Sequence, residues 1–171
     1  MSRDTNDEFA SAACSMQEAD PAYFGAPAPL TAEEIARLGD VVLREIPDAV
    51  VYSDRTGRIR YWNAGAQRIF GYSEAEALGQ SLDIIIPERL RDRHWQGYRQ
   101  MMATGRSRHA AEEVLSVPAM NKAGDPLSIQ FVIAAVPDAH GRPAGIVATL
   151  RDATETFAEM KRLRAAARAQ S

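Results

Sequence analysis

Residues 48–63 read Asp-Ala-Val-Val-Tyr-Ser-Asp-Arg-Thr-Gly-Arg-Ile-Arg-Tyr-Trp-Asn and contain two strand patterns separated by a turn. Residues 49–53 are a short, mostly apolar run typical of a buried strand, and residues 58–62 alternate polar with apolar side chains. The residues between them, Asp54-Arg-Thr-Gly57, are typical of a tight turn. This stretch therefore predicts a β-hairpin.

Residues 30–46, just before the hairpin, predict an amphipathic cap helix. Thr31 and Glu34 have the spacing of a capping box, and Pro47 would end the helix. The apolar positions recur at helical spacing: Ile35, Leu38, Val42 and Ile46. Residues 1–29 mix small, acidic and proline residues without periodicity, which is typical of a disordered tail.

Two short helical segments are predicted directly after the hairpin. Asn63 is placed to cap a helix that Gly71 closes. Ser73 and Glu76 form a second capping-box pattern, for a single turn that ends near Gly79.

Three further strands are predicted near the C-terminal end, at residues 109–120, 126–136 and 144–151. Turn residues at 121–124 and 137–142 separate them. The order of elements is two strands, several short helices, one longer helix and three strands, which predicts an α+β domain.

The longer helix covers Pro87–Met102 and carries a histidine on its apolar side. The predicted stripe consists of Leu90, His94, Gly97 and Met101, with Tyr98 and Met102 at its margin. Gly97 costs about 1 kcal/mol relative to alanine within a helix, and the close approach of a flat body beside His94 would explain it. The pattern makes His94 a candidate ligand, although a lone histidine on an apolar face is more often a satisfied core or boundary residue.

Composition limits the class of protein. The 171 residues have a formal net charge of -3 and are 46% hydrophobic, which fits one globular domain with short extensions. The mild acidity gives no overall attraction to nucleic acid or to an anionic membrane. There is no membrane-spanning run and no signal peptide, so we expect a cytoplasmic protein. The single cysteine, Cys14, excludes an internal disulfide and a cysteine-rich metal site.

No catalytic motif is present in the sequence. It has no phosphate-binding glycine loop, no nucleophile elbow and no paired carboxylates in a recognisable setting. We therefore expect a sensor or interaction module rather than an enzyme.

The ordered series of short motifs resembles the PAS sensory domain over about residues 35–155. The motifs are Asp48-Ala-Val-Val, Asp54-Arg-Thr-Gly57, Tyr61-Trp-Asn-Ala64, Ile69-Phe-Gly-Tyr72, Leu78-Gly79, Ile86-Pro87, Lys122-Ala-Gly124 and Leu150-Arg-Asp-Ala-Thr-Glu155. The resemblance implies a PAS domain at residues 47–153, with a five-stranded antiparallel sheet and short helices over one face. It also implies a ligand cavity or a plain core beneath those helices, and a signal that leaves through the helix after Asp152.

Ile86-Pro-Glu-Arg-Leu-Arg-Asp-Arg-His94, followed by Tyr98, resembles the corresponding helix of haem-binding PAS domains of the oxygen-sensor kinase type. That resemblance implies that His94 is the axial ligand of a b-type haem and that the protein senses a diatomic gas or a redox state. Where those sensors carry a distal arginine, this chain has Leu115, and Phe131 and Ile133 add to an apolar wall. Such a pocket suits carbon monoxide or nitric oxide at least as well as oxygen, which benefits from a hydrogen-bond donor.

The resemblance and the helix pattern together give a set of cofactor-binding residues: Leu90, His94, Gly97, Tyr98, Arg99, Met101, Leu115, Phe131 and Ile133. A second group of residues could either contact the haem or have an ordinary structural role. Its members are Met101, Met102 and Met120 as a sixth iron ligand or as packing, and Arg99, Arg106 and Arg108 as partners of haem propionates or as a solvated face. His109 and His140 lack companions at metal-binding spacing.

Two alternatives to haem stay open. One is a flavin bound non-covalently, because the cysteine motif of light-sensing PAS domains is absent while Trp62 and the pocket aromatics are compatible with a flavin. The other is a filled core without a cofactor, in a domain that only dimerises or binds other proteins.

Residues 154–171 predict a C-terminal signalling or dimerisation helix capped by Thr154, with a seam of Phe157, Met160 and Ala167 interrupted by Arg164. We expect a homodimer in which the 31–46 helix, this helix or both contribute. Because no kinase, cyclase or DNA-binding domain follows, the output is expected to be a separate signalling protein.

Overall fold

The computed structural model describes residues 29–106 and 114–169. The chain divides into two compact units, Met1–Arg37 and Leu38–Ser171. Residues 1–28, 107–113 and 170–171 lie outside the described part, and with them most of the predicted tail as well as Cys14, Arg108 and His109.

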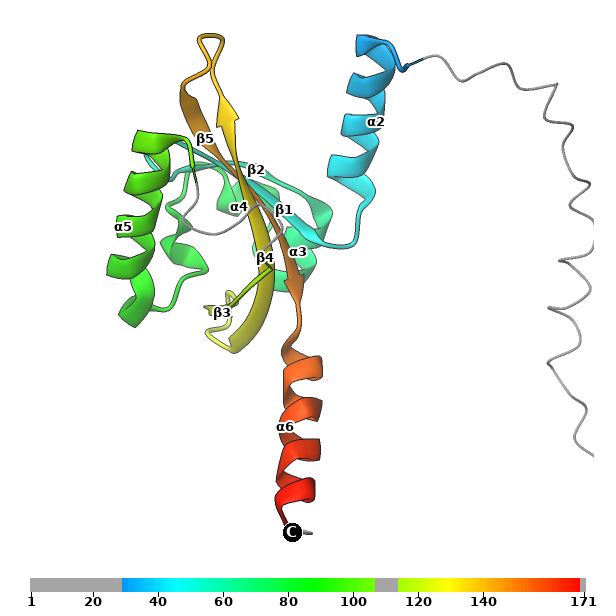
Figure 1. Cartoon of the computed structure of the whole chain (residues 1–171), viewed down its shortest axis with the longest axis vertical. Helices are drawn as coiled ribbons and strands as arrows, with labels where there is room; N and C mark the ends of the chain where they lie inside the picture. The colour runs from blue at the N-terminus through cyan, green and yellow to red at the C-terminus, as the bar shows by residue number, and fades with distance from the viewer. Residues whose placement is uncertain (1–28, 107–113, 170–171) are drawn as a thin grey trace, which may run out of the picture. The chain divides into compact units, whose positions relative to one another are not determined.

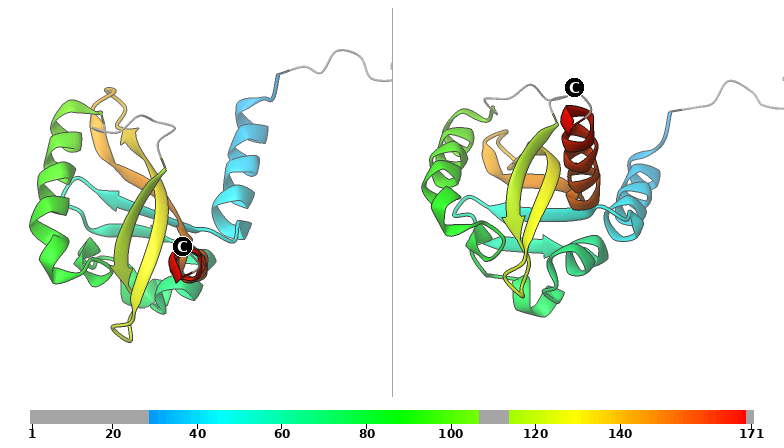
Figure 2. Two further views of the ribbon diagram at one scale, coloured as in Figure 1. Left: turned by 60° about the horizontal axis from the view of Figure 1, so that its bottom comes forward. Right: turned by 90° about the horizontal axis from the view of Figure 1, so that it is seen from below.

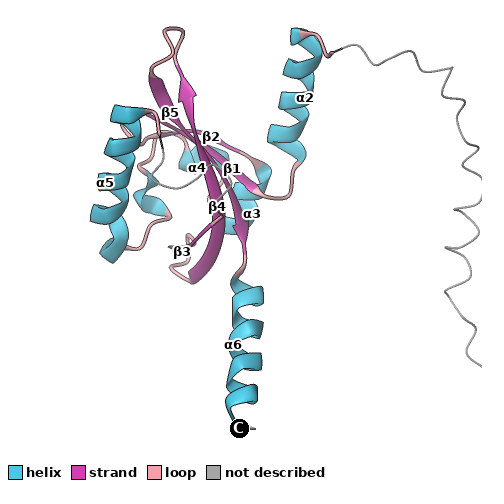
Figure 3. Cartoon of the chain, in the orientation of Figure 1, coloured by secondary structure: helices cyan, strands magenta, loops and turns pink. Residues whose placement is uncertain are grey.

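The described residues form five α-helices, one 3-10 turn and five strands (Figure 1 and Figure 3). In chain order they are α2 (Ala32–Glu45), β1 (Ala49–Asp54), β2 (Ile59–Trp62), α3 (Ala64–Phe70), α4 (Glu74–Ala77), η2 (Leu82–Ile84), α5 (Glu88–Thr104), β3 (Leu115–Met120), β4 (Pro126–Pro137), β5 (Pro143–Asp152) and α6 (Thr154–Ala169).

The five strands form a single sheet in the order β2-β1-β5-β4-β3, and every pairing is antiparallel. The predicted α+β class and five-stranded antiparallel sheet are therefore confirmed. The first strand lies beside the last: Val51 of β1 is opposite Trp62 of β2 on one side and Ala148 of β5 on the other. β3 is observed from Leu115 onward, so the earlier part of the predicted 109–120 strand lies mostly outside the described residues.

One face of the sheet, here called the inner face, carries the core. Its buried side chains include Ala49, Val51, Ile59, Trp62, Ile129, Ile146 and Leu150, and they pack with Ala66 and Phe70 of α3, Ala77 of α4, Leu82 of η2, and Tyr98, Met101 and Met102 of α5. The short helices thus cover this face, as predicted. α6 lies on the other side of β4 from α5 (Figure 2).

The local signals for the short helices are confirmed. The Asn63 side chain accepts hydrogen bonds from the backbone N–H of Ala66 and of Val50, at 2.9 Å and 2.8 Å, so it caps α3 and also ties the helix to β1. Gly71 ends α3 with a left-handed φ of 77°. Ser73 and Glu76 form both bonds of the capping box of α4.

α2 has the predicted cap but contributes nothing to the core. Thr31 and Glu34 exchange capping-box hydrogen bonds. None of the residues of α2 is buried. Five large aliphatic side chains of α2 are exposed: Ile35, Leu38, Val41, Val42 and Leu43.

α5 begins one residue later than predicted. Pro87 is the N-cap residue rather than a member of the first turn, because its ψ of 134° is extended. Gly105, with a φ of 71°, ends the helix. Within the described residues, no helix is long and apolar enough to cross a membrane.

Candidate functional site

The buried side of α5 is rotated relative to the predicted stripe. Tyr98, Met101 and Met102 are buried, and His94 and Trp95 are half-buried. The predicted stripe placed Tyr98 and Met102 at its margin and omitted Trp95. The stripe predicted from helical periodicity is thus shifted by about one residue from the side of the helix that is buried in the structure.

His94 lies on this buried side with an unsatisfied polar atom. Its Nδ1 is buried and has no hydrogen-bond partner in the described part of the chain. Burial lowers the pKa of the imidazole below its ordinary value, and the nearby Asp83 carboxylate opposes that shift only in part. At neutral pH the ring is therefore uncharged, and a neutral imidazole keeps the lone pair that a metal ligand needs.

A buried Nδ1 without a hydrogen-bond partner is energetically unfavourable. A buried polar atom without a partner costs about 1–3 kcal/mol, and such atoms in native proteins ask for an explanation. A bound group that the imidazole nitrogen contacts is one explanation, so the residues present fit a metal-containing cofactor at this position.

Trp95 was not among the predicted site residues, yet it holds the surroundings of His94 in place. Its ring lies edge-on to the His94 ring, with 4.8 Å between centroids. Its Nε1 donates to the Asp83 carboxylate at 2.8 Å. A methyl group on Gly57, in the β1–β2 turn, would overlap the Trp95 ring, so the glycine allows this close contact. The only signal in the sequence was a tryptophan next to the histidine.

Tyr98 fastens α5 to β1. Its hydroxyl donates to the backbone carbonyl of Asp54 at 2.5 Å and shares a hydrogen bond of 2.8 Å with Ser53 Oγ. The Tyr98 and His94 rings are 5.8 Å apart between centroids. Burial raises the pKa of Tyr98, so the phenol stays protonated and keeps its donor.

We expect Tyr98→Phe to lower the free energy of unfolding by about 1–2 kcal/mol, because Ser53 Oγ and the Asp54 carbonyl lose a partner in a buried setting. Urea denaturation followed by circular dichroism measures the change. Tyr61→Phe is the matched control, since the Tyr61 hydroxyl has no hydrogen bond in the described residues, and its effect should stay within about 0.5 kcal/mol. Equal effects of the two substitutions would contradict the role given to the Tyr98 hydroxyl.

The predicted distal residues share the inner face of the sheet. Leu115 of β3 is opposite Phe131 of β4, and Ile133 is opposite Ala148 of β5. Phe131 and Ile133 pack at the margin of the core, and all three predicted residues are only half-buried. They form an apolar surface on the face that α5 covers.

The remaining predicted residues are divided between core and surface. Leu90 is half-buried, and Met101 and Met102 belong to the core. Arg99 and Arg106 are exposed. His140 is exposed in the β4–β5 turn, where its backbone N–H donates to Asp138.

Two observations describe the surroundings of a ligand at this site. A methyl group on Gly97 would meet no neighbouring described atom within 4 Å, so the described chain leaves the space beside this glycine open. No three His, Cys, Asp or Glu side chains gather at metal-binding distance within residues 29–106 and 114–169.

Comparison with known families identifies the fold. The family described as the PAS fold matches residues 43–157, well over half of the chain. The chain belongs to this family.

Two curated relatives match parts of the chain. Sensor protein FixL of Bradyrhizobium diazoefficiens is 45% identical over 53 residues, which are 31% of this chain and 10% of that protein. An uncharacterised protein of Azorhizobium caulinodans is 31% identical over 87 residues, which are 50% of this chain and 12% of that protein. The matched stretches thus span only about a tenth of these relatives.

Solved structures share the fold at low sequence identity. A PAS domain from Colwellia psychrerythraea has a TM-score of 0.62 at 19% identity, covering 71% of this chain and 98% of the other. An RNA-binding light-oxygen-voltage receptor has a TM-score of 0.63 at 18% identity, with coverage of 84% and 40%. A light-oxygen-voltage domain studied with a flavin analogue has a TM-score of 0.56 at 17% identity, with coverage of 81% and 99%.

Proposed function

We propose that this PAS domain binds a b-type haem through His94, senses a diatomic gas or a redox state, and acts through a partner protein rather than as a catalyst. One observation carries the proposal: a half-buried imidazole, kept neutral by burial, has a buried nitrogen without a hydrogen-bond partner in the described residues. The similarity to sensor protein FixL supports a sensory role.

The roles of the chain's own residues follow from their positions. A haem would supply an iron atom able to bind a diatomic gas. His94 would hold the group, while the neighbouring rings of Trp95 and Tyr98 pack against the ring of His94 and restrain it. Leu115, Phe131 and Ile133 would provide an apolar surface whose side chains have no hydrogen-bond donor, which suits carbon monoxide or nitric oxide at least as well as oxygen.

The visible spectrum of the purified protein during titration with haemin tests this proposal. We expect uptake of one haem per chain with a sharp Soret band. Parallel titration with flavin mononucleotide tests the flavin alternative. A protein that takes up flavin but no haem would be a redox or light sensor, and one that takes up neither would be an interaction module without a cofactor.

We also propose that the protein is a homodimer that uses α2. Leu38 and Val42 lie on one side of this helix and are 53% and 43% exposed. The other side carries two ion pairs, Glu33–Arg37 and Asp40–Arg44. Exposed aliphatic side chains gathered on one side of a helix are typical of a contact surface.

We expect Leu38→Glu combined with Val42→Glu to shift the protein from dimer to monomer, because two carboxylates would be placed in an apolar contact. Light scattering coupled to size-exclusion chromatography measures the mass. Arg37→Gln with Arg44→Gln is the matched control: it changes the net charge by the same amount on the opposite side of α2, and it should leave a dimer. A wild-type chain that is monomeric at high micromolar concentration would refute the proposal.

A further inference from the structure

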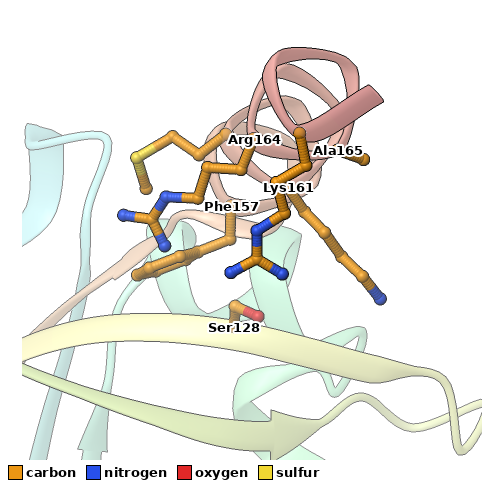
Figure 4. A pocket seen from close by; sticks show the side chains of 7 residues that line it. Ser128, Phe157, Lys161, Arg164 and Ala165 are labelled. Atoms are coloured by element: carbon orange, nitrogen blue, oxygen red, sulfur yellow. The ribbon is translucent and has the colours of Figure 1, made fainter. Parts of the chain in front are cut away.

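The outer face of the sheet carries a groove where α6 passes β4. Its volume is about 490 Å³, and it is lined by Ser128 of β4 and by Phe157, Met160, Lys161, Arg164 and Arg168 of α6 (Figure 4). A smaller hollow of about 220 Å³ shares Ser128 and Phe157 and extends toward Val117 and Pro118 of β3. We call the two together the α6 groove.

The floor of the α6 groove is apolar. Phe157 is half-buried and reaches from α6 toward the strand that bears Ser128 (Figure 4). Met160 and Ala165 line the same side of the helix. This floor offers room for an apolar side chain of moderate size.

The wall of the α6 groove is cationic. Lys161, Arg164 and Arg168 recur at intervals of three and four residues, so they share one side of α6. Arg164 therefore lies in the middle of the side that lines the groove, beside Phe157 and Met160 of the predicted seam. Like charges at such spacing repel each other by a few tenths of a kcal/mol per pair.

These three charges have no counterion among the residues that the structure describes. Within the described residues, Lys161, Arg164 and Arg168 have no hydrogen bond and no ion pair. The neighbouring Arg162, on the opposite side of α6, pairs with Glu159 at 3.0 Å. The helix dipole favours a cation in the last turn and thus explains Arg168, but it does not explain Lys161 or Arg164.

We propose that the α6 groove binds an acidic peptide segment of a partner protein, with one apolar side chain against Phe157 and Met160 and carboxylates on Arg164 and Arg168. Guanidinium groups bind carboxylates in a two-pronged geometry, and the apolar floor adds the burial that a bare ion pair lacks. Charge complementarity identifies the partner as acidic.

A nucleic acid fits the groove less well. Binding to a phosphate backbone draws its affinity from many contacts, whereas this patch has three cations and the whole chain has a formal net charge of -3. Peptide binding by the groove does not depend on haem binding. It is measured on the full chain without added haem, so either proposal can fail while the other holds.

Fluorescence anisotropy with a labelled synthetic peptide tests the proposal. The probe has glutamates on both sides of one phenylalanine, and two further probes replace the glutamates by glutamine or the phenylalanine by serine. We expect the first probe to bind wild-type protein, more weakly as salt rises, and both altered probes to bind at least about tenfold more weakly.

The matching variants are on α6. Arg164→Gln with Arg168→Gln should weaken binding of the acidic probe at least about tenfold, which corresponds to about 1.4 kcal/mol. Arg162→Gln should leave it within about twofold, and circular dichroism should show that all variants keep the fold.

Four results would overturn the proposal. The first is equal binding of the glutamine probe, and the second is unchanged affinity of the double arginine variant. The third is loss of dimer mass in the double variant, which would assign the groove to a second copy of the chain. The fourth is tighter binding of a labelled single-stranded RNA than of the acidic probe, which would assign the groove to nucleic acid.

Discussion

His94→Ala is expected to abolish the sharp Soret band that the proposed haem ligation predicts for wild-type protein with haemin, and to lower haem affinity at least about 100-fold. The substitution removes the half-buried imidazole whose nitrogen has no other partner in the described residues. In the proposed complex His94 would supply the strongest bond between the protein and the iron, so its loss should have a larger effect than that of any residue on the apolar wall. Spectral titration at fixed protein concentration measures the affinity.

Two controls separate ligation from folding. His140→Ala changes an exposed histidine in the β4–β5 turn and should leave the spectrum unchanged, as should His109→Ala. His94→Gly should regain a Soret band when free imidazole is added, because the small ligand can occupy the space of the missing ring. An unchanged spectrum of His94→Ala would end the proposal that this residue holds the haem.

Gly65→Ala is expected to lower the free energy of unfolding by about 3 kcal/mol. A Cβ at this position would lie 2.8 Å from the carbonyl oxygen of Pro47 and closer still to that of Asp48. Both obstacles are backbone atoms at the entry to β1, so relief requires movement of α3 or of the strand. Urea or thermal denaturation measures the loss.

Gly97→Ala is the matched control within a second helix. A methyl group there meets no neighbouring described atom within 4 Å, and alanine is the better helix former. This substitution should therefore raise the free energy of unfolding by up to about 1 kcal/mol in protein without haem. Similar destabilisation by both substitutions would show that the position of α3 against residues 47–48 is not as described.

Local signals in the sequence predicted much of the fold because they act over a few residues. Asn63, Gly71 and the Ser73–Glu76 pair each satisfy backbone groups at a helix end, and that requirement holds whatever the rest of the chain does. The hairpin at residues 48–63 follows from alternation and a turn in the same way. The resemblance to PAS domains supplied what local signals do not, namely that the strands share one sheet.

Contacts between segments far apart in the sequence could not be predicted from local patterns. Nothing in residues 49–54 says that β1 lies beside β5, because that pairing joins segments nearly a hundred residues apart. The contact between Trp95 and Gly57 likewise depends on how α5 approaches the β1–β2 turn. The rotation of the buried side of α5 goes with that contact, which is why Trp95 was missed.

The junction between β5 and α6 is held to β4 by two hydrogen bonds. Thr154, the first residue of α6, accepts a hydrogen bond from the backbone N–H of Ser128, and the carbonyl of Ser128 accepts one from Ala153. The base of α6 is thereby clamped to one residue of β4. α6 has 16 residues and is about 24 Å long at 1.5 Å per residue. A rotation of about 5° at this junction would therefore move the far end of α6 by about 2 Å, so small movements of the sheet would become larger displacements at the end of the helix.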